Sequence, residues 1–222
     1  LLHTAILPKT PAVEPRLPMT EQYTQSEEQA SPTASTGPLN GFRILDLSSV
    51  VSGPMAAVVL ADQGADVIKI EPPGRGDLAR QLGADTELNS QNMGVSFLAQ
   101  NAGKKSVVLD LQESEQVEIL RQLISQSDVF TQNLKPGALA KLGVELDELH
   151  KQHPKLISMS ISGFASDGPG HSRKAYDLLM QAESGLSSIT GSPHAAGRVG
   201  VSLVDIATGQ FAYEAILGAL IQ

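Results

Sequence analysis

The segment VSLVDIATGQ, residues 201–210, carries one charged side chain, Asp205, among ten mostly apolar or small residues. An ionised carboxylate is costly to bury among Val, Leu, Ile and Ala unless something stabilises it. Because an apolar, helix-like run follows, Asp205 suits a helix N-terminus, where Asp is favoured as a cap and the helix dipole favours its charge. A carboxylate at the mouth of a strand can instead act as a nucleophile. From the residues alone, the cap is the favoured interpretation.

Basic and amide side chains stand next to predicted strands and suit phosphate binding. Lys104 and Lys105 precede one strand, while Asn133, Lys135 and Lys141 surround the start of a later helix. Ammonium groups bind phosphate as point charges, and the loops after parallel strands are where open α/β sheets bind ligands. A solvated turn is the simpler interpretation of the lysine pair, so phosphate binding there is a hypothesis.

The first strand–turn–helix has the layout of a dinucleotide-binding unit, and Glu71 at the end of the second strand could hold a ribose hydroxyl. The turn at residues 48–54 has one glycine and lacks the G-x-G-x-x-G pattern, which disfavours a nicotinamide dehydrogenase. Its backbone N–H groups can still face a phosphate at a helix N-terminus. Further along, Asp177 is predicted to cap the helix that follows a Gly/Ser/Pro loop.

Alternating strand and helix patterns must position these side chains. Short β-branched runs predict strands at residues 42–47, 66–70, 106–111, 128–132 and 156–162. Helical patterns predict helices at residues 53–63, 114–125, 136 to about 150, 176–188 and 206–222. This alternation predicts an α/β fold with a mostly parallel sheet and helices on both faces.

Composition and charge exclude several classes of function. The 222 residues are 41% hydrophobic and 18% charged, as in a soluble globular protein, and the formal net charge of −8 argues against nucleic-acid or membrane binding. The absence of Cys excludes disulfides, thiolate zinc sites and a cysteine nucleophile. His150 and His153 lack an acidic third ligand, so no metal site is predicted.

The ends of the chain differ in character from its centre. Residues 1–38 are rich in Pro, Thr, Ser, Glu and Gln and are predicted to be disordered, whereas residues 39–222 are predicted to fold. No run approaches the ~20 apolar residues of a transmembrane helix, and the cytoplasm is the expected location. The last helix is apolar to its end without a stop signal, so we expect a fragment of a longer protein.

Six segments in order along the chain carry a resemblance to a known family: GFRILDLSSVVSGPMAAVVLADQGADVIKIEPPGRGD, NAGKKSVVLDL, QNLKPGALAKLG, LISMSISGFASDGPG, KAYDLLMQAESGL and GRVGVSLVDIATGQFAYEAILGAL. Together, residues 39–222 resemble the family III coenzyme A transferases, the group of formyl-CoA, carnitine-CoA and dicarboxylate CoA transferases. The resemblance implies a Rossmann-like large domain, of which residues 39–222 are the N-terminal part, a smaller domain, and an interlocked homodimer.

The resemblance also implies a chemistry and a set of site residues. Asp205 corresponds to the aspartate that accepts the acyl group from CoA as a mixed anhydride and so makes transfer to a second acid possible. The substrates implied are an acyl-CoA and a small carboxylic acid, for which a dicarboxylate is the expected acceptor, and no cofactor is bound permanently. The positions that correspond to CoA contacts are Val51, Ser52, Leu109, Asp110, Leu111, Gln112, Asn133, Leu134, Lys135, Lys141, Lys174, Ala175, Tyr176 and Asp177.

Two alternatives to a transferase stay open. An acyl-CoA racemase is a relative of this family, but it has His where this chain has Tyr176. Because two-base proton exchange needs an acid or base on each face of the α-carbon, and the pKa of Tyr is near ~10, the transferase is favoured. The other alternative is a CoA-binding remnant that is inactive because half of the family's length is missing, and we expect the isolated 222-residue chain to be inactive.

Overall fold

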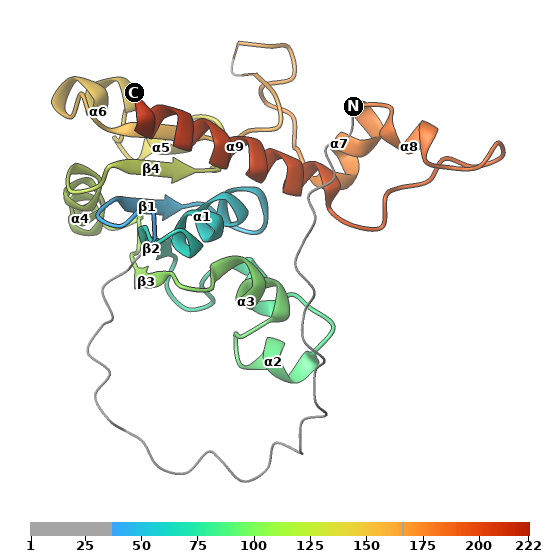
Figure 1. Ribbon diagram of the computed structural model, residues 1–222, viewed down its shortest axis with the longest axis horizontal. Helices are drawn as coiled ribbons and strands as arrows, with labels where there is room; N and C mark the ends of the chain where they lie inside the picture. The colour runs from blue at the N-terminus through green and yellow to red at the C-terminus, as the bar shows by residue number, and fades with distance from the viewer. Residues whose placement is uncertain (1–36, 166) are drawn as a thin grey trace, which may run out of the picture. The chain divides into compact units, whose positions relative to one another are not determined.

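The computed structural model describes residues 37–165 and 167–222 (Figure 1). The predicted disordered segment 1–38 lies outside the described residues except for Gly37 and Pro38. In chain order the elements are β1 (Arg43–Leu47), α1 (Ser52–Asp62), β2 (Asp66–Glu71), η1 (Leu78–Gln81), α2 (Thr86–Ser90), α3 (Val95–Asn101), β3 (Lys105–Val108), α4 (Ser114–Ser125), β4 (Val129–Gln132), α5 (Ala138–Lys141), α6 (Leu146–Gln152), β5 (Ile157–Ser160), α7 (Asp177–Glu183), α8 (Leu186–Ile189) and α9 (Leu203–Ile221).

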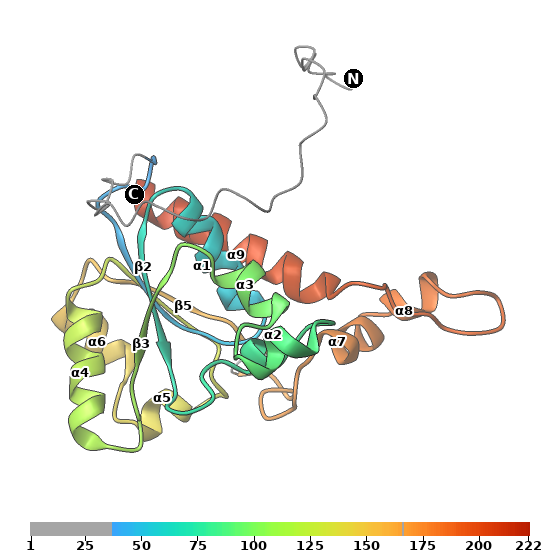
Figure 2. The same cartoon turned by 90° about the horizontal axis from the view of Figure 1, so that it is seen from below.

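The five strands form one parallel sheet in the order β3-β2-β1-β4-β5. This is the strand order of the Rossmann fold, and it confirms the predicted α/β class with a parallel sheet. β1 and β4 are neighbours at the centre, and the chain leaves them toward opposite faces of the sheet. Figure 2 shows α4 and α6 on one side of the strands and α1, α3 and α9 on the other.

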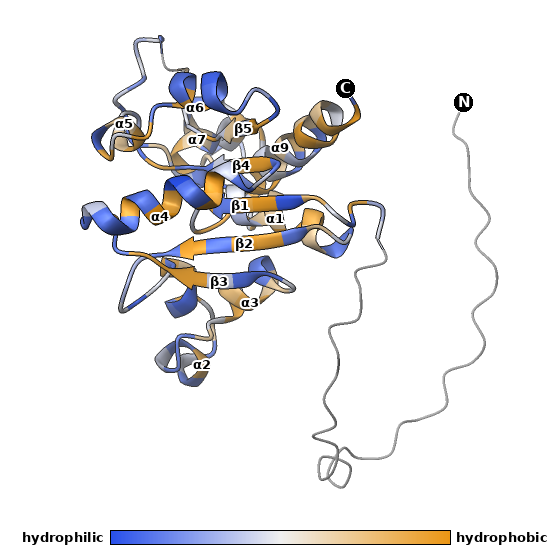
Figure 3. Ribbon diagram, turned by 90° about the vertical axis from the view of Figure 1, so that its left-hand side faces the viewer, coloured by the Kyte–Doolittle hydropathy of each residue, from blue (hydrophilic) through white to orange (hydrophobic). Residues whose placement is uncertain are grey.

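Alternate residues of the central strand point into two separate cores. Ile44 packs with Ala57 and Leu60 of α1 and Ile216 of α9. Leu45 and its neighbours pack on the other face against α4, α5 and α6, with the core residues Leu47, Ile70, Leu109, Val117, Leu120, Ile124, Phe130, Leu139, Val144, Leu149 and Leu156. This alternation is the two-residue period of a strand that is covered on both faces. Figure 3 shows hydrophobic residues along the central strands and a mixed pattern on α4, which buries one stripe.

Two predicted helices are interrupted by glycines with positive φ. The helix predicted from residue 136 to about 150 is divided into α5 and α6, and Gly143 between them has φ 68°. The helix predicted at residues 176–188 is divided into α7 and α8 by Gly185, with φ 81°. Left-handed backbone ends an α-helix at low cost only when the residue is Gly.

Helix α9 begins at Leu203, three residues before the start predicted at Ile206. By length and composition alone it is apolar enough to cross a membrane, in contrast to the prediction that no run approaches that length. It packs on α1 in the described fold, where Gly209, Ala212 and Ile216 are its buried residues. Its start lies near the start of α1, and this neighbourhood positions the candidate site.

Candidate active site

Asp205 lies in the first turn of α9, and its carboxylate faces α1. The Ser52 hydroxyl donates a hydrogen bond of 3.0 Å to Asp205 Oδ1. The two helices approach closely because α9 has a glycine at the contact: a Cβ on Gly209 would lie 2.7 Å from the Ser52 carbonyl oxygen and 2.9 Å from Met55 Cβ. Gly209 therefore allows the Ser52 hydroxyl to reach the half-buried Asp205 carboxylate.

The predicted role of Asp205 as the cap of α9 is wrong, because the N-cap residue is Ser202 and Asp205 is already helical. Burial is the largest influence on the Asp205 carboxyl and raises its pKa above the usual value. The hydrogen bond from Ser52 lowers the pKa of Asp205, while the charge of Asp177 raises it. The net direction is opposite to the one expected from the helix dipole, because desolvation disfavours the charged form.

A cavity of about 620 Å³ opens beside Asp205 at the carboxyl ends of β4 and β5. Eight of the residues selected from the sequence line it: Ser52, Asn133, Leu134, Lys135, Lys174, Ala175, Tyr176 and Asp205. The others that line it are Pro136, Ile161, Ser162, Gly163, Phe164, His171, Ser172, Arg173, Met180, Val204 and Thr208. Most of these additional residues belong to the long loop after β5. The Gly/Ser/Pro-rich composition of that loop is the sequence signal that could have identified them, because long loops often carry binding residues.

Asn133 joins the ends of the two central strands. Its side-chain Oδ1 accepts a hydrogen bond of 2.9 Å from the Ser49 amide, and its Nδ2 donates one of 2.8 Å to the Ser49 carbonyl. One amide side chain after β4 thus fixes the turn after β1. In an open α/β sheet, ligands bind in the crevice where neighbouring strands lead to opposite faces, and this turn borders that crevice.

The remaining residues selected from the sequence are not among the described residues that line the cavity. Val51 is the N-cap of α1, and Lys141 is exposed at the end of α5. Leu109 is 5% exposed and belongs to the hydrophobic core. Hydrogen bonds hold the loop after it, since the Asp110 amide donates to Gln116 of α4 and the Gln112 amide donates to Asp110. Leu111 packs against the core. A CoA contact at these positions stays a prediction.

The hypothesis that Lys104 binds phosphate is wrong. Its side chain is 2% exposed, and Nζ lies 2.9 Å from Asp46 Oδ2. Nζ also donates to the Pro54 carbonyl at 3.0 Å and to Asn101 Oδ1 at 2.9 Å, so its three protons are all used. Lys105 is exposed and pairs with Asp66.

A second buried ion pair shapes the turn after β1. Lys69 Nζ lies 2.8 Å from Asp77 Oδ2, and both side chains are 1% exposed. Asp77 Oδ1 accepts a hydrogen bond of 3.1 Å from the amide of Val50, which has a positive φ of 70°. A β-branched residue in the left-handed region is strained, and it persists only where the surroundings hold it. The buried pair provides that constraint next to the start of α1.

The hypothesis that Glu71 binds a ribose hydroxyl is wrong, because its carboxylate is already bonded within the protein. Both of its carboxylate oxygens accept from Arg80 at 2.7 Å, and they also accept from the Ser106 hydroxyl and the Asp77 amide. Burial alone would raise the pKa of Glu71, but these hydrogen bonds outweigh it and lower the pKa to about 2. Glu71 therefore holds the segment after β2 in place.

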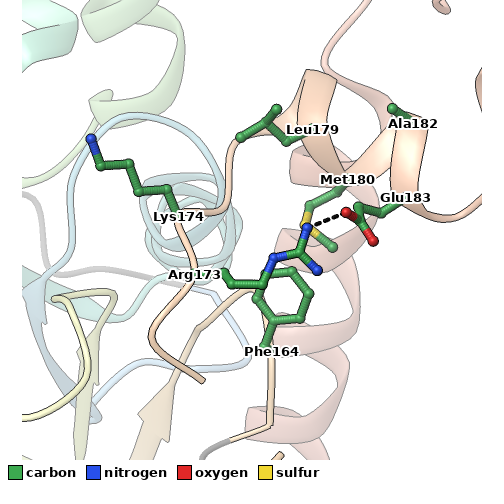
Figure 4. A pocket seen from close by; sticks show the side chains of 7 residues that line it. All are labelled: Phe164, Arg173, Lys174, Leu179, Met180, Ala182 and Glu183. Atoms are coloured by element: carbon green, nitrogen blue, oxygen red, sulfur yellow. Dashed lines mark hydrogen bonds and ion pairs between the residues drawn. The ribbon is translucent and has the colours of Figure 1, made fainter. Parts of the chain in front are cut away.

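A smaller hollow of about 410 Å³ adjoins the cavity and shares Phe164, Arg173, Lys174 and Met180 with it. Figure 4 shows the Arg173 guanidinium over the Phe164 ring, at 4.9 Å from the ring centre, and in an ion pair with Glu183. Lys174 points away from this pair. Among residues 37–165 and 167–222, no group of three His, Asp or Glu side chains is placed to hold a metal ion.

Comparisons with known proteins agree with the geometry. The family model of CoA-transferase family III matches residues 39–222. The chain is 41% identical over 189 residues to succinyl-CoA:glutarate CoA-transferase of Mus musculus, which covers 85% of this chain and 43% of that protein. Acetyl-CoA:oxalate CoA-transferase of Acetobacter aceti is 39% identical over 194 residues, which covers 86% of this chain and 49% of that protein.

Solved structures show the same fold. A CAIB/BAIF family protein from Brucella suis has a TM-score of 0.76 at 36% identity, over 83% of this chain and 49% of that chain. A hypothetical protein from Mycobacterium tuberculosis has the same TM-score and identity, over 84% of this chain and 51% of that chain. The chain thus spans about half the length of the relatives it matches.

Proposed function

Because this chain belongs to CoA-transferase family III, we propose that the protein transfers coenzyme A from an acyl-CoA to a small carboxylic acid, with Asp205 as the covalent acyl acceptor. The observation that carries the proposal is the half-buried Asp205 carboxylate on the wall of a cavity that Lys135 and Lys174 also line. A carboxylate whose pKa is raised is a more basic and hence stronger nucleophile whenever it is ionised.

In the first step, an Asp205 oxygen attacks the thioester carbonyl. A C–O bond forms, the C–S bond breaks, and CoA leaves as a thiolate, so that a mixed anhydride remains on Asp205. The thiolate then attacks the aspartyl carbonyl and releases the donor acid. The acceptor carboxylate attacks this aspartyl thioester, which forms a second anhydride and releases the thiolate again. Attack of the thiolate on the acceptor carbonyl gives the new acyl-CoA and restores the Asp205 carboxylate. CoA is a substrate in this scheme.

A small dicarboxylate is the acceptor that we favour. The names of two relatives specify glutarate and oxalate as acceptors. The charge of the cavity agrees with anionic substrates, since Lys135 and Lys174 line it and Asp205 is its one acidic residue among the described lining residues, while Arg173 is already paired with Glu183. These cations suit both the phosphates of CoA and a second carboxylate. The interlocked homodimer and the cytoplasmic location stay predictions.

The test uses the protein at its full natural length, with succinyl-CoA as donor, glutarate as acceptor and hydroxylamine as trap. We expect glutaryl-CoA to form, and hydroxylamine to convert Asp205 into a hydroxamate that peptide mass spectrometry locates. Asp205→Ala is expected to abolish transfer while CoA binding persists. Full turnover by Asp205→Ala contradicts the role of Asp205.

The same assay separates the alternatives. Exchange of deuterium at the α-carbon of an acyl-CoA without transfer identifies a racemase, for which the exposed Tyr176 is a poor acid or base. CoA binding with neither reaction identifies an inactive remnant. Either outcome contradicts the proposed transfer.

A further inference from the structure

The start of α9 is capped by a residue from another helix. Its N-cap residue Ser202 makes no side-chain capping hydrogen bond. Instead, Asp177 Oδ1 accepts a hydrogen bond of 2.8 Å from the Val204 amide, and the Asp205 amide lies 3.4 Å from the same oxygen. The N–H groups of the second and third helical residues are those that an N-cap side chain normally satisfies. Asp177 performs this task from 27 positions earlier in the chain.

Asp177 does not cap its own helix, in contrast to the prediction from the sequence. The N-cap of α7 is Tyr176, and Asp177 is the first helical residue. Asp177 is also not among the described residues that line the cavity, in contrast to Lys174 and Tyr176 just before it. Its carboxylate is therefore directed at the backbone of α9 and not at the substrate space.

A buried amide holds Asp177 in this position. Gln181, one turn further along α7 and 0% exposed, donates from Nε2 to Asp177 Oδ2 at 2.6 Å. Its Oε1 accepts from the Val199 amide at 2.9 Å, and its Nε2 also lies 3.3 Å from the Val201 carbonyl. Both ends of one side chain thus tie α7 to the segment that leads into α9. A fully bonded buried network of this kind specifies one arrangement, because breaking it leaves polar groups unpaired.

We infer that Asp177, clamped by Gln181, is a positioning residue that fixes the first turn of α9 and so holds the Asp205 carboxylate against Ser52 at the cavity wall. The inference rests on the proposed role of Asp205 as acyl acceptor. A small misplacement of a reacting group costs a large factor in rate even when substrate binding is unchanged. A positioning role therefore predicts that variants of Asp177 lower kcat and leave the acyl-CoA KM nearly unchanged. The CoA contact implied by family resemblance predicts instead a higher acyl-CoA KM.

The charge of Asp177 has a second effect on Asp205. It raises the pKa of Asp205 in addition to the effect of burial. The other ionisable groups around the cavity are Lys135 after β4 and His171, Arg173, Lys174 and Tyr176 before α7, whereas α1 presents the uncharged Ser52. A variant at position 177 leaves all of these groups in place, so a change in the pH profile of acylation reports on Asp177.

The test uses two single substitutions and their combination in the full-length protein. In Asp177→Asn, the new amide NH₂ faces the amide NH₂ of Gln181, so neither group can accept the hydrogen bond. In Gln181→Glu, the new carboxylate faces the Asp177 carboxylate, so neither group can donate it. In the double variant, the new amide at position 177 donates to the new carboxylate at position 181, which still accepts from the Val199 amide. The oxygen of the amide at position 177 still accepts from the Val204 amide. The hydrogen bond between the two side chains is then restored with its direction reversed.

We expect each single variant to lower kcat by at least about tenfold, with the acyl-CoA KM changed by less than about threefold. The double variant is expected to regain at least about tenfold over either single variant. It should regain only part of the melting temperature, because the Val201 carbonyl then faces a carboxylate oxygen in place of the Gln181 amide. Because negative charge moves away from Asp205 in the double variant, its acylation midpoint is expected at lower pH than in the wild type. Glu214→Gln, which removes one exposed charge from α9, is the control and should match the wild type.

Three results overturn the inference: wild-type kcat in Asp177→Asn, a rise in the acyl-CoA KM at constant kcat, or a folded double variant no faster than the single variants. Failure of the proposed function is distinguishable, because it appears as full turnover in Asp205→Ala. If Asp205→Ala is inactive and Asp177→Asn transfers normally, the result supports Asp205 as the acyl acceptor and contradicts the positioning role of Asp177.

Discussion

Ser52 and Asp205 are 153 positions apart in the chain, and a hydrogen bond of 3.0 Å from the Ser52 hydroxyl to Asp205 Oδ1 joins the first turns of α1 and α9. A hydrogen bond to a charged carboxylate favours its ionised form. Burial and the charge of Asp177 act in the opposite direction. Ser52 is therefore the described side chain that favours the ionised form of Asp205 by direct contact.

The first prediction concerns removal of that hydroxyl. In Ser52→Ala the pKa of Asp205 is expected to rise further, because the interaction that lowers it is gone while burial remains. The acylation rate, followed as CoA release in a single turnover, should then reach half of its maximum at a higher pH than in the wild type. Ser52→Thr keeps a hydroxyl and should stay close to the wild-type profile. A midpoint that moves to lower pH contradicts the assignment.

The second prediction compares a buried lysine with an exposed one in the same sheet. Lys69→Ala leaves Asp77 charged and buried without its partner, which is expected to lower the free energy of unfolding by about 3–5 kcal/mol. Lys105, whose side chain is 69% exposed, pairs with Asp66 at the surface, and Lys105→Ala should cost less than about 1 kcal/mol. Urea unfolding followed by circular dichroism measures both. Equal losses would show that the Lys69–Asp77 pair is not the buried constraint described above.

Much of the fold is predictable from the sequence because it depends on local patterns. The β-branched runs of β1, β2 and β4 alternate with helical segments, and that alternation determines the parallel sheet and its two covered faces. The segment from η1 to α3 is not predictable in this way, because its helices are short and α2 buries none of its residues, so no apolar period marks it. The helices broken at Gly143 and Gly185 show that a single positive φ can divide a continuous pattern.

The candidate site is less predictable, because its side chains are governed by partners that are distant in the sequence. Lys104 looks like a solvent-facing lysine until Asp46, 58 positions earlier, is placed beside it. The early start of α9 has the same cause, since its capping carboxylate belongs to α7. Family resemblance selects Asp205 and, at the end of the loop before α7, Lys174, Ala175 and Tyr176, all of which line the cavity, because it carries information about tertiary structure that periodicity lacks.

The third prediction is a dependence of stability on acidic pH through Glu71. Its pKa in the folded protein is about 2, below the ordinary value of 4.5. Because the folded pKa is depressed, the stabilisation by its charged form is complete above pH ~4.5 and is lost as pH falls toward about 2. The difference in unfolding free energy between wild type and Glu71→Gln should therefore be constant near neutral pH and shrink below pH ~4.5. Glu118→Gln, which removes one partner of an exposed ion pair with Arg121, is the control and should cost less than about 1 kcal/mol at neutral pH. A difference that grows on acidification contradicts the assigned shift.

The fourth prediction tests the close approach of α1 and α9 with two glycines of the same helix. In Gly209→Ala the new Cβ lies 2.7 Å from the Ser52 carbonyl oxygen, closer than such atoms can approach, so the helices must separate. We expect a loss of about 1–3 kcal/mol in unfolding free energy and a lower kcat, because Ser52 moves away from Asp205. Gly218→Ala meets nothing within 4 Å and should instead stabilise the protein by up to about 1 kcal/mol, since Ala is the better helix former. Thermal melts and turnover of the two variants give the comparison. If both alanines stabilise the protein and leave kcat unchanged, the contact at Gly209 does not position Asp205.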